Sequence, residues 1–305
     1  MSQQSDNAAD SAVRIGLICG VLAYGMWGLL PIYLKQLTVV DPLEIVGHRI
    51  LWSVPFGALI LSFRHQWRET LKAFASPRVL MLLGFSALVI AGNWLLYVWA
   101  VANDRVLQAS LGYYINPLMF VAAGVFVLKE KLGRLQMLAV ALAAAGVGVL
   151  AIGAGVIPWV SLMLAVSFTA YGYARKTINV GAMPGLFIET VLLAPFAFVF
   201  LLWYSAAHGL AFGHEGLRID LLLIAAGPVT VLPLLFFALA ARRLKFTTLG
   251  FLQYIGPTGQ LLLGLYYGEA FTIFHAICFG LIWTALAILS IDAVRNNGKT
   301  RAAAA

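Results

Sequence analysis

Long apolar runs alternate with short polar segments along nearly the whole sequence. An α-helix rises 1.5 Å per residue, so roughly 20 apolar residues cross the hydrocarbon core of a bilayer. The runs therefore predict ten membrane-spanning helices, at residues 15–35, 42–63, 79–102, 106–128, 133–152, 157–175, 185–204, 220–241, 246–268 and 271–291. The connections are short except for two, which leaves no room for a separate soluble domain. We expect an all-α integral membrane protein whose function resides in the membrane.

Composition supports this interpretation. Hydrophobic residues make up 62% of the chain and charged residues 10%, and the mean hydropathy is +0.93. A water-soluble fold of this composition would expose too much apolar surface. The two cysteines, Cys19 and Cys278, each lie inside an apolar run, so we expect neither a disulfide framework nor a cysteine metal site.

The net charge of +8 reflects topology rather than a nucleic-acid partner, because the basic residues lie in short clusters at the ends of apolar runs. With the N-terminus inside, 16 of the 20 lysines and arginines fall in cytoplasmic segments. Three, Lys35, Arg105 and Arg218, fall in outer loops, and Arg49 lies within a span. The positive-inside rule thus predicts a multi-pass protein of the bacterial inner membrane with both termini cytoplasmic.

One polar connection has a helical pattern of its own. Between residues 64 and 78, Arg64, Arg68 and Lys72 recur every four residues, while Trp67, Leu71 and Phe74 occupy another face. This spacing is typical of a short helix lying on the anionic inner leaflet. A solvated basic loop with one buried tryptophan is the alternative.

An internal repeat divides the chain into two halves. The segment from Tyr114 to Pro117 matches that from Tyr254 to Pro257 at an offset of 140 residues, and Pro55 matches Pro195 at the same offset. We expect two five-helix units, 15–152 and 153–291, flanked by cytoplasmic tails 1–14 and 292–305. Since five is odd, the second unit must enter the membrane the opposite way up. Such inverted repeats place a substrate site near the midplane between the halves.

Ionisable residues inside the spans are candidates for function, because a charge far from water in a bilayer is costly. Arg49 is the basic residue deep in a span, and it either contacts a substrate or is held structurally by carbonyls or a carboxylate. The adjacent His48 either couples protons or hydrogen-bonds between helices. Glu189 occupies the repeat position of Arg49 and joins the candidate set.

Amide and phenol side chains in three spans complete the expected cavity. Polar groups facing lipid would be unsatisfied, so they should point inward. The candidates of this kind are Asn93, Tyr97, Tyr113, Asn116, Gln253 and Tyr254.

The matched prolines Pro117 and Pro257 each remove a backbone donor from a span, and we expect them to act as hinges. The spans show no paired acid and base, no activated nucleophile and no metal-ligand cluster, so we expect no enzyme activity, no cofactor and no metal.

Six segments carry a resemblance to a known family. They are AYGMWGLLPIYLK at 23–35, HRILWS at 48–53, NWLLYVWAV at 93–101, ASLGYYINPL at 109–118, SFTAYGYARK at 167–176 and LGFLQYIGPT at 249–258. Together they resemble the RarD group of the EamA branch in the drug/metabolite transporter superfamily. The resemblance covers essentially the whole chain, and it implies two inverted EamA-like repeats, cytoplasmic termini and a central cavity from which small molecules are moved.

The sequence therefore predicts a permease that moves a small metabolite or drug of unknown identity by alternating access. The alternatives are an intramembrane enzyme and a non-transporting membrane sensor. The expected partners are this small molecule and membrane lipid, and a homodimer is left open.

Overall fold

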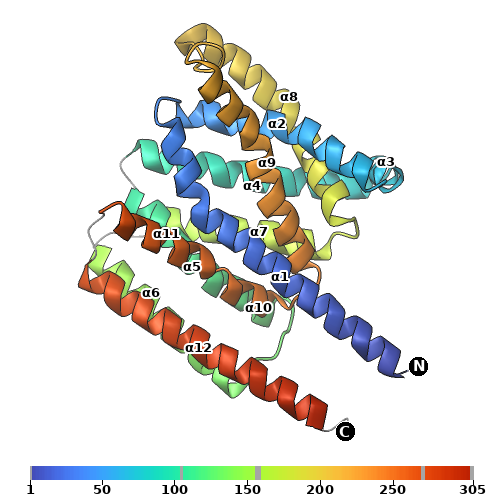
Figure 1. Ribbon diagram of the computed structural model, residues 1–305, viewed down its shortest axis with the longest axis vertical. Coiled ribbons are helices and arrows are strands. Elements are labelled where there is room, and N and C mark those ends of the chain that lie inside the picture. Colours follow the sequence, from blue (N-terminus) through green and yellow to red (C-terminus); the bar gives the residue numbers. More distant parts are fainter. Residues whose placement is uncertain (1, 104–105, 155–158, 269–271, 303–305) are drawn as a thin grey trace.

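The structure is a computed structural model that describes residues 2–103, 106–154, 159–268 and 272–302, and every regular element in this part of the chain is a helix (Figure 1). The elements are α1 (Ser2–Leu34), the 3₁₀ helix η1 (Lys35–Leu37), α2 (Pro42–Phe63), α3 (Trp67–Phe74), α4 (Pro77–Ala102), α5 (Val106–Phe126), α6 (Arg134–Ala154), α7 (Trp159–Thr177), α8 (Ala182–His208), α9 (Leu217–Ala241), α10 (Phe246–Leu252), α11 (Ile255–Tyr266) and α12 (Ile273–Ala302).

Seven of the described helices are long and apolar enough to cross a membrane, namely α1, α2, α4, α6, α8, α9 and α12. A further apolar helical segment, Leu111–Phe126, lies in α5. Large apolar side chains such as Phe63, Phe85, Phe126 and Phe196 are more than 60% exposed on the bundle. A surface of this kind is suited to lipid rather than to water, so the chain is a multi-pass membrane protein.

The ninth predicted span differs from the observed structure, because the segment expected as one helix is divided into α10 and α11. The break lies at Gln253 and Tyr254, where backbone bonds close over three residues, as in Gly256 N to Gln253 O at 3.1 Å. Pro257 has no N–H to donate to the carbonyl of Gln253, so the α-helical ladder cannot continue there. Proline in the first turn of α11 leaves no donor missing.

The segment between α2 and α4 forms a helix, α3, rather than an irregular loop. Thr70 and Ala73 are buried on one side, and Leu71 remains 63% exposed. The Trp67 ring packs edge-on against Phe187 of α8, with centroids 5.4 Å apart. This contact fixes the short helix to the end of the bundle.

The helices pack in a pattern that links the two halves of the chain. α6 runs beside α12 at one end of the long axis in Figure 1, and α2 lies with α8 and α9 at the other. Helix α9 packs against α1 and α2, and helix α4 packs against α7 and α8. Helix α5 packs against α7, and α1 packs against α11. The N- and C-terminal ends leave the bundle on the side where α3 lies.

Aromatic rings fill the centre of the bundle. The central aromatic cluster comprises Tyr24, Phe120, Tyr171, Phe237 and Phe246, one ring from each of α1, α5, α7, α9 and α10, and each is less than 2% exposed. Phe120 stacks on Phe246 with centroids 4.4 Å apart, and Tyr171 stacks on Phe237 at 5.9 Å. Aromatic pairs at these separations add to the free energy gained by burial alone.

Candidate functional site

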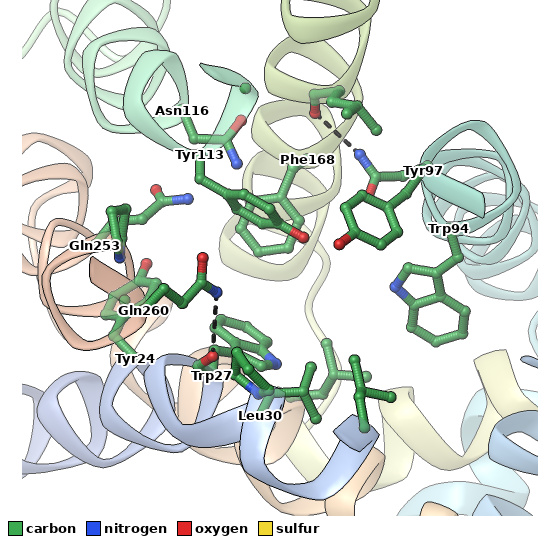
Figure 2. Close-up of a pocket in the computed structure, with 18 of the residues that line it drawn as sticks. Tyr24, Trp27, Leu30, Trp94, Tyr97, Tyr113, Asn116, Phe168, Gln253 and Gln260 are labelled. Carbon is green, nitrogen blue, oxygen red and sulfur yellow. Dashed lines mark hydrogen bonds between the residues drawn. The ribbon is translucent and has the colours of Figure 1, made fainter. Parts of the chain in front are cut away.

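A cavity of about 210 Å³ lies between the helices of the two halves (Figure 2). At ~30 Å³ for each water molecule, it has room for about seven waters or a small organic molecule. Its wall is formed by α1, α2, α4, α5, α7, α9, α11 and the break before α11. The α1 residues of the wall lie between Tyr24 and Leu34. Tyr24 also belongs to the central aromatic cluster, so this cluster closes one end of the cavity.

Arg49 supplies the positive charge of this wall. Its Nε donates to Oγ1 of Thr230 on α9 at 3.0 Å, and its guanidinium lies over the ring of Trp94 on α4, 4.7 Å from the centroid. Contact with a ring face contributes a cation–π attraction that strengthens away from water. Arg49 lies inside the helix bundle but is only half-buried, because part of its side chain faces the cavity.

Aromatic rings form two sides of the cavity. Trp27 of α1 meets Phe168 of α7 edge to face at 5.7 Å, and Tyr97 of α4 meets Tyr113 of α5 at 6.0 Å. Figure 2 shows the two phenol rings pointing toward each other across the space between α4 and α5. These rings give the cavity broad apolar surfaces with hydroxyl groups at their edges.

Amide side chains from several helices also line the cavity. Asn93 Nδ2 donates to Leu164 O at 3.0 Å and to Ser167 Oγ at 2.8 Å, and Gln260 Nε2 donates to Trp27 O at 3.3 Å. In contrast, Oδ1 of Asn116, Oε1 of Gln253 and the hydroxyl of Tyr24 are buried without a hydrogen-bond partner in the described protein. Buried polar atoms are normally hydrogen-bonded, so these three are exceptions among the described residues.

Six of the nine residues predicted for the cavity line it, namely Arg49, Asn93, Tyr97, Tyr113, Asn116 and Gln253. The other three, His48, Glu189 and Tyr254, lie elsewhere. Tyr254 is 1% exposed and belongs to a separate apolar cluster formed with α5, α6 and α12. Of the two predicted hinge prolines, Pro257 lines the cavity, whereas Pro117 lies outside its wall.

His48 belongs to a polar cluster at the beginning of α2. Its Nδ1 accepts a hydrogen bond from Trp52 Nε1 at 3.1 Å, and its Nε2 lies 3.7 Å from Glu44 Oε1. The carboxylate of Glu44 also accepts from the backbone N–H groups of Ala211 and Phe212, both at 3.0 Å. These contacts tie α2 to the connection between α8 and α9.

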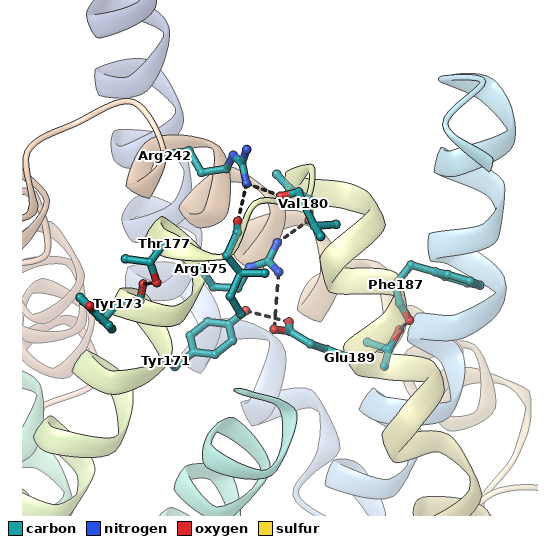
Figure 3. Close-up of polar contacts among 11 residues, drawn as sticks. Tyr171, Tyr173, Arg175, Thr177, Val180, Phe187, Glu189 and Arg242 are labelled. Carbon is teal, nitrogen blue, oxygen red and sulfur yellow. Dashed lines mark hydrogen bonds and ion pairs between the residues drawn. The ribbon is translucent and has the colours of Figure 1, made fainter. Parts of the chain in front are cut away.

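Glu189 of α8 is held by two residues of α7 (Figure 3). Its Oε1 lies 3.5 Å from Arg175 Nη1, and its Oε2 accepts a bond of 3.5 Å from the hydroxyl of Tyr171. The carboxylate borders a small void of about 10 Å³ that Arg49 borders as well. Glu189 and Arg49 are therefore neighbours across this void, but Glu189 is paired with a different arginine.

Sequence reasoning missed several residues of the wall, chief among them Tyr24, Trp27 and Phe168. A signal was present on α1, since Tyr24, Trp27, Pro31 and Leu34 recur at three- and four-residue spacing and so share one helix face. Thr230, which holds Arg49, carried no such signal. Among the described residues, no group of three or more His, Cys, Asp or Glu side chains could hold a metal ion.

Comparison with known proteins identifies the chain. Residues 14–153 match the model of the EamA-like transporter family. An uncharacterised transporter of Vibrio cholerae is 45% identical over 94% of this chain and 96% of its own length. Protein RarD of Salmonella typhimurium is 43% identical over 94% and 98%, respectively. A crystal structure of a protein with 20% identity shares the fold, with a TM-score of 0.70 over 90% of this chain and 97% of the other.

Apolar helices around a central cavity, together with these relatives, define a membrane transporter. The chain belongs to the RarD family of EamA-like proteins in the drug/metabolite transporter superfamily.

Proposed function

We propose that this protein is a permease of the bacterial inner membrane that moves a small molecule by alternating access. The observation that carries the proposal is the cavity itself, whose wall is drawn from both halves of the chain. A site between two halves that can rock against each other is reached from either side of the membrane in turn.

The proposal includes ten spans arranged as two inverted five-helix repeats. The packing supports it, because replacing each helix by its counterpart 140 residues away converts the α2–α9 contact into α8–α4 and the α1–α9 contact into α7–α4. The same exchange converts the α5–α7 contact into that between α11 and α1. The α6–α12 and α2–α8 contacts map onto themselves. A two-fold relation between the halves accounts for all of these pairs.

The described conformation then corresponds to a cavity reached from outside. With the N-terminus cytoplasmic, the α1 residues of the wall lie in the outer half of the helix, and the central aromatic cluster lies on the inner side. Exchange of access requires that the rings of this cluster separate.

The test is transport by proteoliposomes that contain only the purified protein. A panel of small radiolabelled metabolites and antibiotics is offered on one side, and at least one should equilibrate or accumulate in a protein-dependent manner. An intramembrane enzyme would instead alter the chemistry of a compound, which mass spectrometry of the recovered panel would reveal. A sensor would bind a compound without moving it.

A further inference from the structure

We propose that the cavity selects a small organic anion with a planar apolar body, whose anionic group is bound by Arg49. The inference concerns recognition and deepens the proposed permease function, on which it rests for the movement of the bound molecule.

The charge of the cavity wall carries the first step. Among the described residues that line the cavity, Arg49 is the one charged side chain. In the described structure, the Nε of Arg49 donates a hydrogen bond to the neutral hydroxyl of Thr230. A guanidinium carries five N–H donors in a planar fork, so the terminal amino groups remain available to a ligand.

The carboxylates near Arg49 do not neutralise it. The two ion pairs of the described chain join Glu189 to Arg175 and Glu44 to His48, and neither includes Arg49. Glu189 borders the same small void as Arg49, yet it is fixed by Arg175 and Tyr171. A charge inside a bilayer protein without a counter-ion is strongly disfavoured, so the cavity favours a ligand that supplies one.

The contacts of Arg49 differ from those of two other cations, Lys176 and Arg242. Lys176 Nζ donates to the carbonyls of Ala241 and Leu244 at 3.1 and 2.5 Å, and Arg242 Nη1 donates to the carbonyls of Ile178 and Val180. These oxygens lie at or just beyond helix C-termini, where the backbone favours positive charge. No such carbonyl receives the guanidinium of Arg49 in the described structure, and its other contact is the ring face of Trp94.

The rest of the wall determines the shape of the ligand. The ring of Trp94 covers one face of the Arg49 guanidinium. A ligand can therefore approach in the plane of the guanidinium and accept two parallel hydrogen bonds, which is the geometry that carboxylates prefer. Beyond it, the rings of Trp27, Phe168 and Tyr113 offer apolar faces to a flat body. The amide side chains of Asn116 and Gln253 add polar groups to the wall on the α5 and α10–α11 side.

The same wall disfavours cations and zwitterions. No Asp or Glu side chain lines the described cavity, so a ligand ammonium group would find only ring faces and neutral oxygens. It would also be repelled by Arg49 across a medium of low dielectric.

Three probes of one skeleton test the inference directly: phenylacetate, its neutral analogue phenylacetamide, and the cation phenethylamine. Binding to the purified full-length protein is measured by calorimetry and by quenching of tryptophan fluorescence. We expect phenylacetate to bind at least about tenfold more tightly than phenylacetamide, the ratio equivalent to one charge-assisted hydrogen-bond pair, and phenethylamine to bind most weakly.

Substitutions assign the preference to one side chain. Arg49→Met should bind phenylacetate and phenylacetamide equally, and Arg49→Lys should retain a reduced preference for the anion because it keeps the charge and loses the fork. Arg218→Met is the matched control, since Arg218 is a basic residue outside the cavity that bonds the side chain of Gln36. It should keep the parental preference.

The inference is overturned if parental protein fails to bind phenylacetate, if the acid and the amide bind equally, or if Arg49→Met keeps the preference. If Arg49→Met accumulates poorly, the inference is still tested by two measurements. These are the binding of phenylacetate and phenylacetamide to the parental protein, and their binding to Arg49→Lys. Uptake into proteoliposomes separates the two proposals. If the protein binds the anion but takes up no compound, the permease function is contradicted and the anion site is supported. If it takes up a compound without preferring anions, the permease function is supported and the anion site is contradicted.

Discussion

Nη1 of Arg175 lies 3.5 Å from Oε1 of Glu189, and each side chain is only 2% exposed. Arg175 also donates from Nη2 to the carbonyl of Ala182 at 2.6 Å. The pair therefore joins the end of α7 to the beginning and the first turns of α8 (Figure 3). Both groups have left water, and each relies on the other for compensation.

Glu189→Gln should destabilise the protein, because it leaves the Arg175 charge buried without a counter-ion. Loss of one partner of a buried pair costs about 3–5 kcal/mol in proteins. We expect a lower melting temperature in detergent and reduced accumulation in the membrane. The double variant Arg175→Met/Glu189→Met removes both charges and should melt above either single variant. A melting temperature for Glu189→Gln equal to that of the parent would contradict this role for the pair.

Gly227→Ala should weaken the contact between α9 and α2. A Cβ atom at Gly227 would overlap the carbonyl group of Trp52, and backbone cannot rotate away as a side chain does. Overpacking of this kind costs about 1–3 kcal/mol. Gly280→Ala on α12 is the control, because its Cβ would meet no atom within 4 Å. Thermal unfolding of the two variants should show a loss only for Gly227→Ala, and equal curves would argue against close backbone packing at this crossing.

Pro117→Ala and Pro257→Ala should both insert normally and slow transport. Pro257→Ala should have the larger effect, since it restores an N–H able to bond the carbonyl of Gln253 and so favours a helix continuous through the break. This change would move Gln253, which lines the cavity. Initial uptake rates per molecule of reconstituted protein provide the measurement. Parental rates in both variants would show that the prolines are tolerated and not used as hinges.

Alkaline phosphatase fused after residue 305 should be inactive, and the enzyme inserted between Gly209 and Gly216 should be active. The expectation follows from the excess of lysine and arginine in the segments assigned to the cytoplasm. Green fluorescent protein at the same two positions should give the opposite pattern, because it matures only in the cytoplasm. An active phosphatase at the C-terminus would overturn either the orientation or the even number of spans.

The sequence predicted the helices well because long apolar runs carry a strong signal. The bounds of α2 agree with the expected 42–63 at both ends, helped by Asp41, whose Oδ1 accepts from the N–H of Leu43 at 2.8 Å, and by Pro42 in the first turn. The break between α10 and α11 was missed, although Pro257 and its glycine neighbours were visible in the sequence. Proline is common in membrane helices, so its presence alone does not separate a kink from a break.

The site was predictable only in part, because periodicity reports the face of a helix and not its partner. Arg49 was found from the cost of a buried charge, but its contact with Thr230 joins residues 181 positions apart. Glu189 carried the same signal as Arg49, yet its partner Arg175 was counted among the basic residues of the cytoplasmic segments. Tertiary packing, which the pattern does not contain, decided which of the two ionisable residues faces the cavity.

Burial of both native thiols makes this chain a ready background for site-directed labelling. Cys19 is 7% exposed and Cys278 is fully enclosed, and both are free. Maleimides react with accessible thiolate, so neither position should respond in the folded protein. A single cysteine introduced on the α8–α9 connection would then report which side of the membrane a water-soluble reagent can reach. Pairs of labels on cysteines introduced in α1 and α4 would follow the separation of these helices during a transport cycle without removal of either native cysteine.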